Sequence, residues 1–154
     1  MNALRSFAPH AHWFLRFALG SVFLYHGLTK FPVLGGLAEM MGMPVFMVGL
    51  LAAVETVGAI LILAGGLGSD WMTRLGGLLI APVMLGAIFM VHLQHGWNSV
   101  NMGSGNEGRG MEFQVTLLMI SLFFLFVGND TVSRETSAGE KEQRAEKSSA
   151  RQPA

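Results

Sequence analysis

The chain has 154 residues, of which 51% are hydrophobic and 13% are charged, whereas a soluble domain usually has about 25% charged residues. The ten basic and ten acidic residues cancel to a net charge of zero, which gives no support for nucleic-acid binding. The chain has no cysteine, which excludes disulfide relays, thiolate catalysis and cysteine-based metal sites.

The charges are concentrated near the C-terminus. Residues 130–154 contain five of the ten basic residues and five of the ten acidic residues. The remaining chain therefore has too few charges to solvate a globular surface, and lipid is the better solvent for it. The sequence predicts an all-α, polytopic membrane four-helix bundle followed by a disordered, charged C-terminal tail.

Four apolar stretches have the roughly 20 residues that a helix needs to cross a bilayer. In chain order we expect helices over about 12–30, 45–67, 75–93 and 111–128. Gly35-Gly36 and Gly65-Gly66 mark the breaks after the first and second helices, and a glycine-rich loop connects the third helix to the fourth. The predicted organisation is an N-terminal cytoplasmic segment at 1–11, a four-helix domain at 12–128 and a cytoplasmic tail at 129–154.

The distribution of Lys and Arg predicts the orientation in the membrane. Arg5, Arg74 and the tail cations lie on the side that holds both chain ends, and Lys30 and Arg109 lie on the other. We therefore expect a multi-pass protein of a bacterial inner membrane with both termini in the cytoplasm. Arg16, near the start of the first helix, is expected to reach the cytoplasmic headgroups.

Glu55 is the most informative polar residue. It lies about ten residues into the second helix, which places it ~15 Å deep, near the middle of the bilayer. Ionisable groups at that depth are costly unless paired and tend to mark function. We expect Glu55 to face the bundle interior with a partner on the first or third helix; a purely structural hydrogen bond is the alternative.

Further ionisable residues lie at three helix ends on the extracytoplasmic side, where they would form a polar vestibule above Glu55. They are His26, Lys30, His92, His95, Arg109 and Glu112. Charged residues that only end a helix at the interface are the alternative for Lys30, Arg109 and Glu112, and a water-facing role is the alternative for the two later histidines. Trp13, Trp71 and Trp97 lie at predicted helix ends, as expected for an interfacial aromatic belt.

No metal site is predicted. The methionines of the first outer loop could bind Cu(I), but a soft apolar loop explains them as well. The sequence has no Glu-x-x-His or His-x-x-x-His pair.

Several motifs carry a family resemblance. The first helix reads RFALGSVFLYHGLTK from Arg16 to Lys30, and the second contains Glu55-x-x-Gly58. The third ends His92-Leu-Gln-His95-Gly-Trp, and a glycine-rich loop leads to Gly-Met-Glu112-Phe. In this order and spacing the motifs resemble the DoxX family of four-helix membrane proteins, over about residues 12–128.

The resemblance implies more about architecture than about activity. Many members of the family are labelled oxidoreductases, after relatives of a thiosulfate:quinone oxidoreductase subunit. Its characteristic polar residues fall on His26, Lys30, Glu55, His92 and Glu112 of this sequence. Distant relatives that perform quinone-linked thiol chemistry rely on cysteines, which this chain does not have.

Three functions remain open, and the sequence does not decide whether the chain is an enzyme. The first is a quinone-interacting oxidoreductase subunit with Glu55 and His92 as catalytic candidates, and with cofactor-binding candidates at His26, Lys30, His95 and Glu112. No haem, Fe–S or nucleotide motif is present, so electrons would need a redox or membrane protein partner. The others are a non-catalytic scaffold or assembly component, and a small proton- or metal-linked transporter.

Overall fold

The computed structural model describes residues 6–100 and 108–130, and these form helices and turns. The helical elements are η1 (Ala8–His10), α2 (His12–Lys30), η2 (Phe31–Val33), α3 (Leu34–Met41), α4 (Val45–Gly65), α5 (Asp70–Ala87), η3 (Ile88–His92), η4 (Leu93–His95) and α6 (Glu112–Val127). The predicted all-α four-helix architecture is confirmed. Most of the predicted tail, residues 131–154, lies outside the described residues.

The helix bounds differ from the prediction in two places. The third long helix starts earlier, at Asp70, and continues beyond α5 as the π-helix η3 and the 3-10 helix η4 to His95. The short helix α3 was not predicted because Gly35-Gly36 was interpreted as a break. Glycine weakens a helix without forbidding it, and α3 ends where a helix commonly does, at a glycine in the left-handed region (Gly42, φ 62°).

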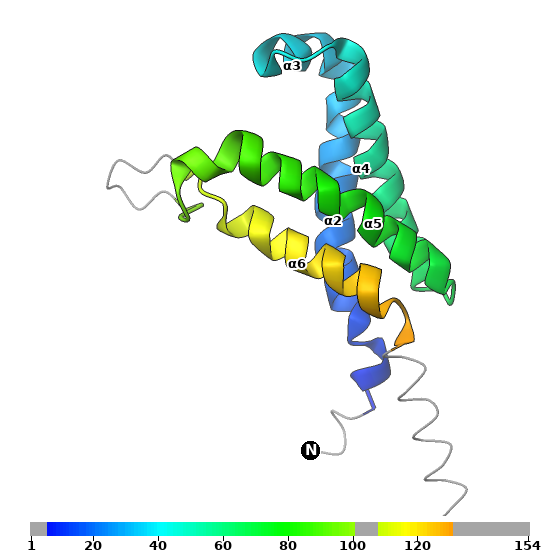
Figure 1. The fold of residues 1–154 in the computed structure, drawn as a ribbon. Helices are drawn as coiled ribbons and strands as arrows, with labels where there is room; N and C mark the ends of the chain where they lie inside the picture. The colour runs from blue at the N-terminus through cyan, green and yellow to red at the C-terminus, as the bar shows by residue number, and fades with distance from the viewer. Residues whose placement is uncertain (1–5, 101–107, 131–154) are drawn as a thin grey trace, which may run out of the picture.

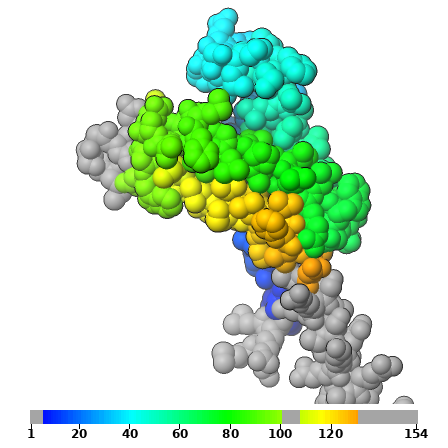
Figure 2. Space-filling view, viewed as in Figure 1, coloured from blue at the N-terminus to red at the C-terminus, as the bar shows by residue number. Residues whose placement is uncertain are grey.

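Helices that follow one another in the chain pack side by side. α2 lies along α4, α4 along α5 and α5 along α6, whereas α2 and α6 touch over a shorter length. Figure 1 shows the α5–α6 pair crossing the α2–α4 pair obliquely, with α3 lying across one end of α2 and α4. In the space-filling view of Figure 2, α3 and the far end of α5–α6 project in different directions.

Two helical segments are long and apolar enough to cross a membrane, by length and composition. They are Val45–Gly65 and the continuous helical segment Asp70–His95. Large apolar side chains are exposed on the outer faces of the helices, including Phe14, Phe17, Ile60, Leu78 and Phe126. A face of this kind suits lipid, as expected for a polytopic membrane helix bundle.

Two adjacent glycines bring α5 against the backbones of both its neighbours. A Cβ added to Gly76 would lie 2.9 Å from the backbone nitrogen of Ile62 on α4. A Cβ added to Gly77 would lie 2.6 Å from the carbonyl oxygen of Ser121 on α6. Small residues permit such close approach between membrane helices, so this glycine pair sets where α5 crosses the other two.

Arg16 does not reach the headgroups as predicted; it is fully buried. Its guanidinium lies 4.8 Å from the ring centre of Phe124, a cation–π contact. The guanidinium also donates to four acceptors, which are His12 Nδ1 (2.9 Å), the Ile62 carbonyl (2.5 Å), Thr73 Oγ1 (3.0 Å) and Asn129 Oδ1 (2.6 Å). These partners come from α2, α4, α5 and the end of α6, so one side chain joins all four long helices.

The physical reason lies at the end of α4. The last carbonyls of a helix have no partner within it, and the Gly66 N–H bonds to the carbonyl of Leu63. Arg16 supplies the donor for the Ile62 carbonyl. A cation is also favoured at a helix C-terminus by the helix dipole.

Arg74 donates hydrogen bonds to the last carbonyls of α6, as Arg16 does at the end of α4. It donates to the carbonyls of Leu125 (3.3 Å), Phe126 (2.7 Å) and Val127 (3.2 Å). Its side chain also pairs with Asp70 at 2.6 Å and with Asp130 at 3.3 Å. The first two residues of the predicted tail, 129 and 130, are therefore bound to the start of α5.

Candidate functional site

The polar residues singled out in the sequence form two clusters. In the first, the Lys30 ammonium lies 2.5 Å from Oε2 of Glu55. Glu55 is 5% exposed and Lys30 is partly buried. The expectation that Glu55 faces the interior and finds a partner on the first helix is confirmed.

The position of this ion pair follows from the contact between α2 and α4. Gly27 packs against the helix backbone at Ala52 and Thr56, where a Cβ would have no room. Lys30 lies about one turn beyond Gly27, and its ammonium also donates to the His26 carbonyl at 3.1 Å. A buried charge is strongly destabilising without its partner, so Lys30 and Glu55 stabilise each other within the helix pair.

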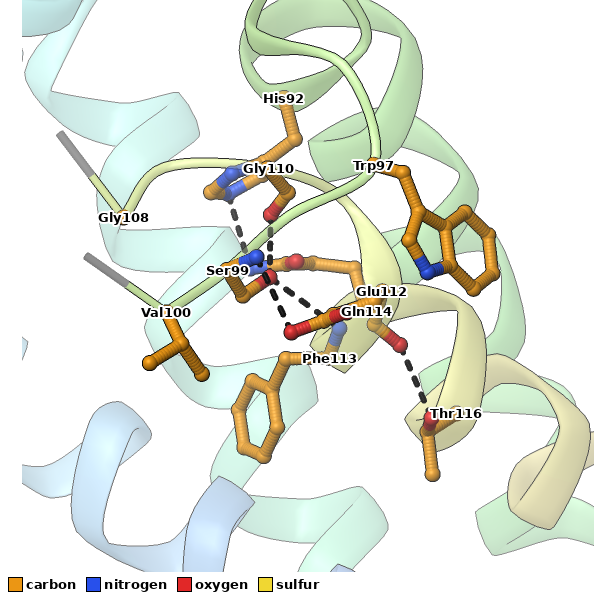
Figure 3. A pocket seen from close by; sticks show the side chains of 10 residues that line it. All are labelled: His92, Trp97, Ser99, Val100, Gly108, Gly110, Glu112, Phe113, Gln114 and Thr116. Atoms are coloured by element: carbon orange, nitrogen blue, oxygen red, sulfur yellow. Dashed lines mark hydrogen bonds between the residues drawn. The ribbon is translucent and has the colours of Figure 1, made fainter. Parts of the chain in front are cut away.

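The second cluster lines an open groove of about 700 Å³ where α5 ends and α6 begins. Figure 3 shows its lining side chains, which are both polar and aromatic. The groove is lined by His92, Trp97, Ser99, Val100, Gly108, Gly110, Glu112, Phe113, Gln114 and Thr116.

Backbone hydrogen bonds hold the two sides of the groove together. The N–H of Met111 donates to the Gly96 carbonyl, and the N–H of Glu112 donates to the Trp97 carbonyl, each at 3.0 Å. Gly96 has φ 74°, a left-handed conformation that lets the chain turn after η4. This pairing brings the segment after His92 alongside the first residues of α6.

His92 and Glu112 are each held by specific contacts within the groove. His92 Nδ1 lies 2.7 Å from the Arg109 carbonyl oxygen, and its Nε2 lies 3.0 Å from Nε2 of Gln114. Glu112 Oε1 accepts the backbone N–H of Ser99 at 3.1 Å. Because Glu112 is the first residue of α6, the helix dipole also stabilises its carboxylate. The groove thus places an imidazole and a carboxylate beside aromatic side chains.

His26 and His95 lie apart from both clusters. Both side chains are exposed, and neither lines the groove. Between His92 and His95 the chain passes from π-helix to 3-10 helix, so the angle between the two side chains differs from that of a regular α-helix. Cofactor binding by His26 and His95 stays a prediction.

The expected vestibule is divided in two. Within residues 6–100 and 108–130, no hydrogen bond links the Lys30–Glu55 pair to the His92 groove. The oblique crossing of α5 and α6 over α2 and α4 directs the two clusters apart (Figure 1). In the same part of the chain, no group of three or more His, Asp or Glu residues could hold a metal ion.

Sequence reasoning missed three groove residues, Gln114, Ser99 and Trp97. Gln114 lies in the mostly apolar α6, two residues after Glu112, and an amide in that setting was the signal that could have identified it. Ser99 belongs to a loop and carried no signal. Trp97 was interpreted as part of an interfacial belt, although its side chain lines the groove.

Comparison with known proteins gives a consistent result. The DoxX family model matches residues 11–93, a range that includes Lys30, Glu55 and His92. A Bacillus subtilis (strain 168) protein named "Putative oxidoreductase CatD" is 32% identical over 118 residues, covering 75% of this chain and 77% of that protein. An "Uncharacterized protein" of Haemophilus influenzae is 28% identical over 136 residues, covering 83% and 90% respectively. No solved structure matches.

Proposed function

Because this chain belongs to the DoxX family of membrane-associated proteins, we propose that it is a membrane subunit of an oxidoreductase system whose His92 groove binds a quinone ring. The observation that carries the proposal is the presence of His92 and Glu112 in one groove with Trp97 and Phe113. The name of the Bacillus subtilis relative supports the redox class.

The groove chemistry suits a quinone head. A quinone ring needs apolar contact on its faces and hydrogen-bonding groups near its two carbonyl oxygens. Reduction to a quinol consumes two electrons and two protons. An imidazole and a carboxyl group are the side chains that most often act as general acids and bases. The electrons would come from a redox partner protein, because the sequence carries no haem or Fe–S ligand pattern.

The proposed location is a bacterial inner membrane, with both termini in the cytoplasm and the groove on the opposite side. Arg16 and Arg74 lie at the end of the bundle where α2 begins and α6 ends, and Lys30 ends α2 at the other. The chain has no native cysteine, so a single introduced cysteine reports accessibility cleanly. Ser99→Cys should react with an impermeant maleimide in intact cells, and Leu67→Cys, at an exposed position of the turn after α4, should react only after lysis.

Quinone titration tests the proposed function directly. The full chain in lipid nanodiscs would be titrated with decylubiquinone and menadione, and binding followed by quenching of tryptophan fluorescence. We expect His92→Ala and Glu112→Gln each to weaken binding about tenfold, or about 1.4 kcal/mol, because each substitution alters a polar side chain that lines the groove. Gln94→Ala, at an exposed position of η4 outside the groove lining, is the matched comparison and should change the Kd by less than about twofold. Absence of quenching, or equal Kd values for His92→Ala and the unsubstituted chain, would contradict the proposal.

A second function, a non-catalytic scaffold, is favoured by the ion pair of Glu55 with Lys30. In that case Glu55 serves helix packing and moves no proton. If Glu55 relays protons, Glu55→Gln should lower quinone turnover while leaving the protein folded. If the protein is a non-catalytic scaffold, the unsubstituted chain should support no quinone turnover, and Glu55→Gln should lower stability only.

A further inference from the structure

The hydrogen bonds around His92 specify which ring nitrogen carries the proton. Its Nδ1 lies 2.7 Å from the Arg109 carbonyl oxygen, which can only accept, so Nδ1 must carry a hydrogen. A neutral imidazole has one N–H, so Nε2 is then a lone pair. Gln114 lies 3.0 Å away with its NH₂ group toward that lone pair (Figure 3).

The other half of the Gln114 amide supplies the second observation. Its oxygen, Oε1, is buried and has no hydrogen-bond partner among the described residues. Buried amide oxygens are normally hydrogen-bonded. Reversing the amide would not help a neutral ring, because Oε1 would then face the lone pair of Nε2, acceptor against acceptor. The neutral state of His92 therefore leaves this oxygen unsatisfied.

We propose that Gln114 is a positioning residue that places the proton on His92, an inference that rests on the proposed function of the groove. In the neutral state it donates to Nε2 and holds the Nδ1–H form of the ring. When Nε2 takes a proton, a half-turn of the amide brings the unpartnered Oε1 to accept from it. His92 can then gain or lose a proton at Nε2 without leaving the groove.

Among the described residues, the other charged and titratable groups near His92 are not hydrogen-bonded to its Nε2. Glu112 on α6 lines the same groove, but Oε1 of its carboxylate is bonded to the Ser99 N–H. His95 on η4 is exposed, and Arg109 contacts the ring through its backbone carbonyl. Gln114 is thus the only side chain that hydrogen-bonds to Nε2 in the part of the chain that the structure describes.

The test is nitrogen NMR of the full chain, labelled with ¹⁵N-histidine, in lipid nanodiscs without quinone. The His92 signals are assigned by their loss in His92→Asn. At a pH where His92 is neutral, we expect a protonated Nδ1 and an unprotonated Nε2, the reverse of the form that free histidine prefers in water. A neutral His92 with its hydrogen on Nε2 would overturn the inference, and this readout needs no further variant.

A substitution then tests the role of Gln114. Gln114→Glu replaces an amide that can donate by a carboxylate that only accepts, so Nε2 must carry a hydrogen as well as Nδ1. We expect His92 to be doubly protonated at a pH where the unsubstituted chain has it neutral. Gln94→Glu is the control, since it adds the same charge to η4, where Gln94 is exposed and bonds to the Val91 carbonyl. A neutral His92 in folded Gln114→Glu would refute the assignment.

The two proposals can fail separately. The NMR measurement reads the ring without any ligand, so a failure of decylubiquinone and menadione to bind would remove the quinone function and leave the His92–Gln114 pair intact. The opposite result, quinone binding together with hydrogen on Nε2, would remove only the positioning role of Gln114.

Discussion

Replacement of Arg16 by methionine tests what holds the four helices together. The substitution removes four hydrogen bonds from one guanidinium and the contact with Phe124. Side-chain hydrogen bonds in a membrane protein contribute ~0.6 kcal/mol each on average, so the four sum to about 2.4 kcal/mol. We expect a loss close to this, about 2 kcal/mol, or roughly 30-fold in the folding equilibrium.

Two effects modify that figure in opposite directions. Methionine removes a charge from a buried site, and replacing buried charges by apolar groups can itself be favourable. Against this, the Ile62 carbonyl would lose its donor and become a buried unsatisfied acceptor, at a cost of ~1–3 kcal/mol. Thr73 and Asn129 would still bond to each other at 2.9 Å, and Asn129 to the Gly65 carbonyl at 3.0 Å. We expect the cost of the unsatisfied Ile62 carbonyl to exceed the gain from removing the buried charge, so the variant is less stable than the unsubstituted chain.

The assay is reversible unfolding in mixed detergent micelles with increasing dodecyl sulfate, followed by circular dichroism. Arg16→Lys keeps the charge but cannot reproduce the fork of donors, so it should lose a similar amount. Ser21→Ala, at an exposed position of the same helix, is the control. A stability of Arg16→Met within about 0.5 kcal/mol of the unsubstituted chain, the range of surface substitutions, would show that Arg16 does not hold the helices together.

Three other predictions use the same unfolding measurement. Gly77→Ala should lower the stability of the protein by about 1–3 kcal/mol, because the added Cβ would meet the backbone of α6. Gly86→Ala is the control: it lies in open space on the same helix, and it should be neutral or raise stability by up to ~1 kcal/mol. Equal effects would contradict the packing account. Lys30→Met should cost ~3–5 kcal/mol because it leaves Glu55 buried without its partner, and adding Glu55→Leu should recover most of the loss; additive losses would argue against a coupled pair. Arg74→Met should release the last carbonyls of α6 and lower the unfolding midpoint, and an unchanged midpoint would count against capping.

The helices and the Glu55 partner could be predicted because each follows from a local requirement. Apolar stretches of sufficient length must be helical in lipid, and a carboxyl group in the middle of one must find a partner. Lys30, one turn past the close contact at Gly27, was within reach on the neighbouring helix. Such inferences need only the order and length of the helices.

The errors concern partners that are distant in the sequence. Arg16 was assigned to the headgroups because its acceptors, at the ends of α4 and α6, become neighbours only after folding. Gln114 was missed because a neutral amide is a weaker signal than a charge, and its importance depends on which way the His92 ring turns. The angular relation of His92 and His95 depends on a π-helix that periodicity does not reveal.

The continuous segment Asp70–His95 connects the two ends of the molecule as a single rod. The rod touches backbone on both sides at Gly76 and Gly77, about a quarter of the way along it. At ~1.5 Å per residue, the pivot lies ~10 Å from Asp70 and ~23 Å from His92. A tilt about this point would move the groove more than twice as far as the start of α5. Spin labels placed at the two ends of the rod would measure any such tilt.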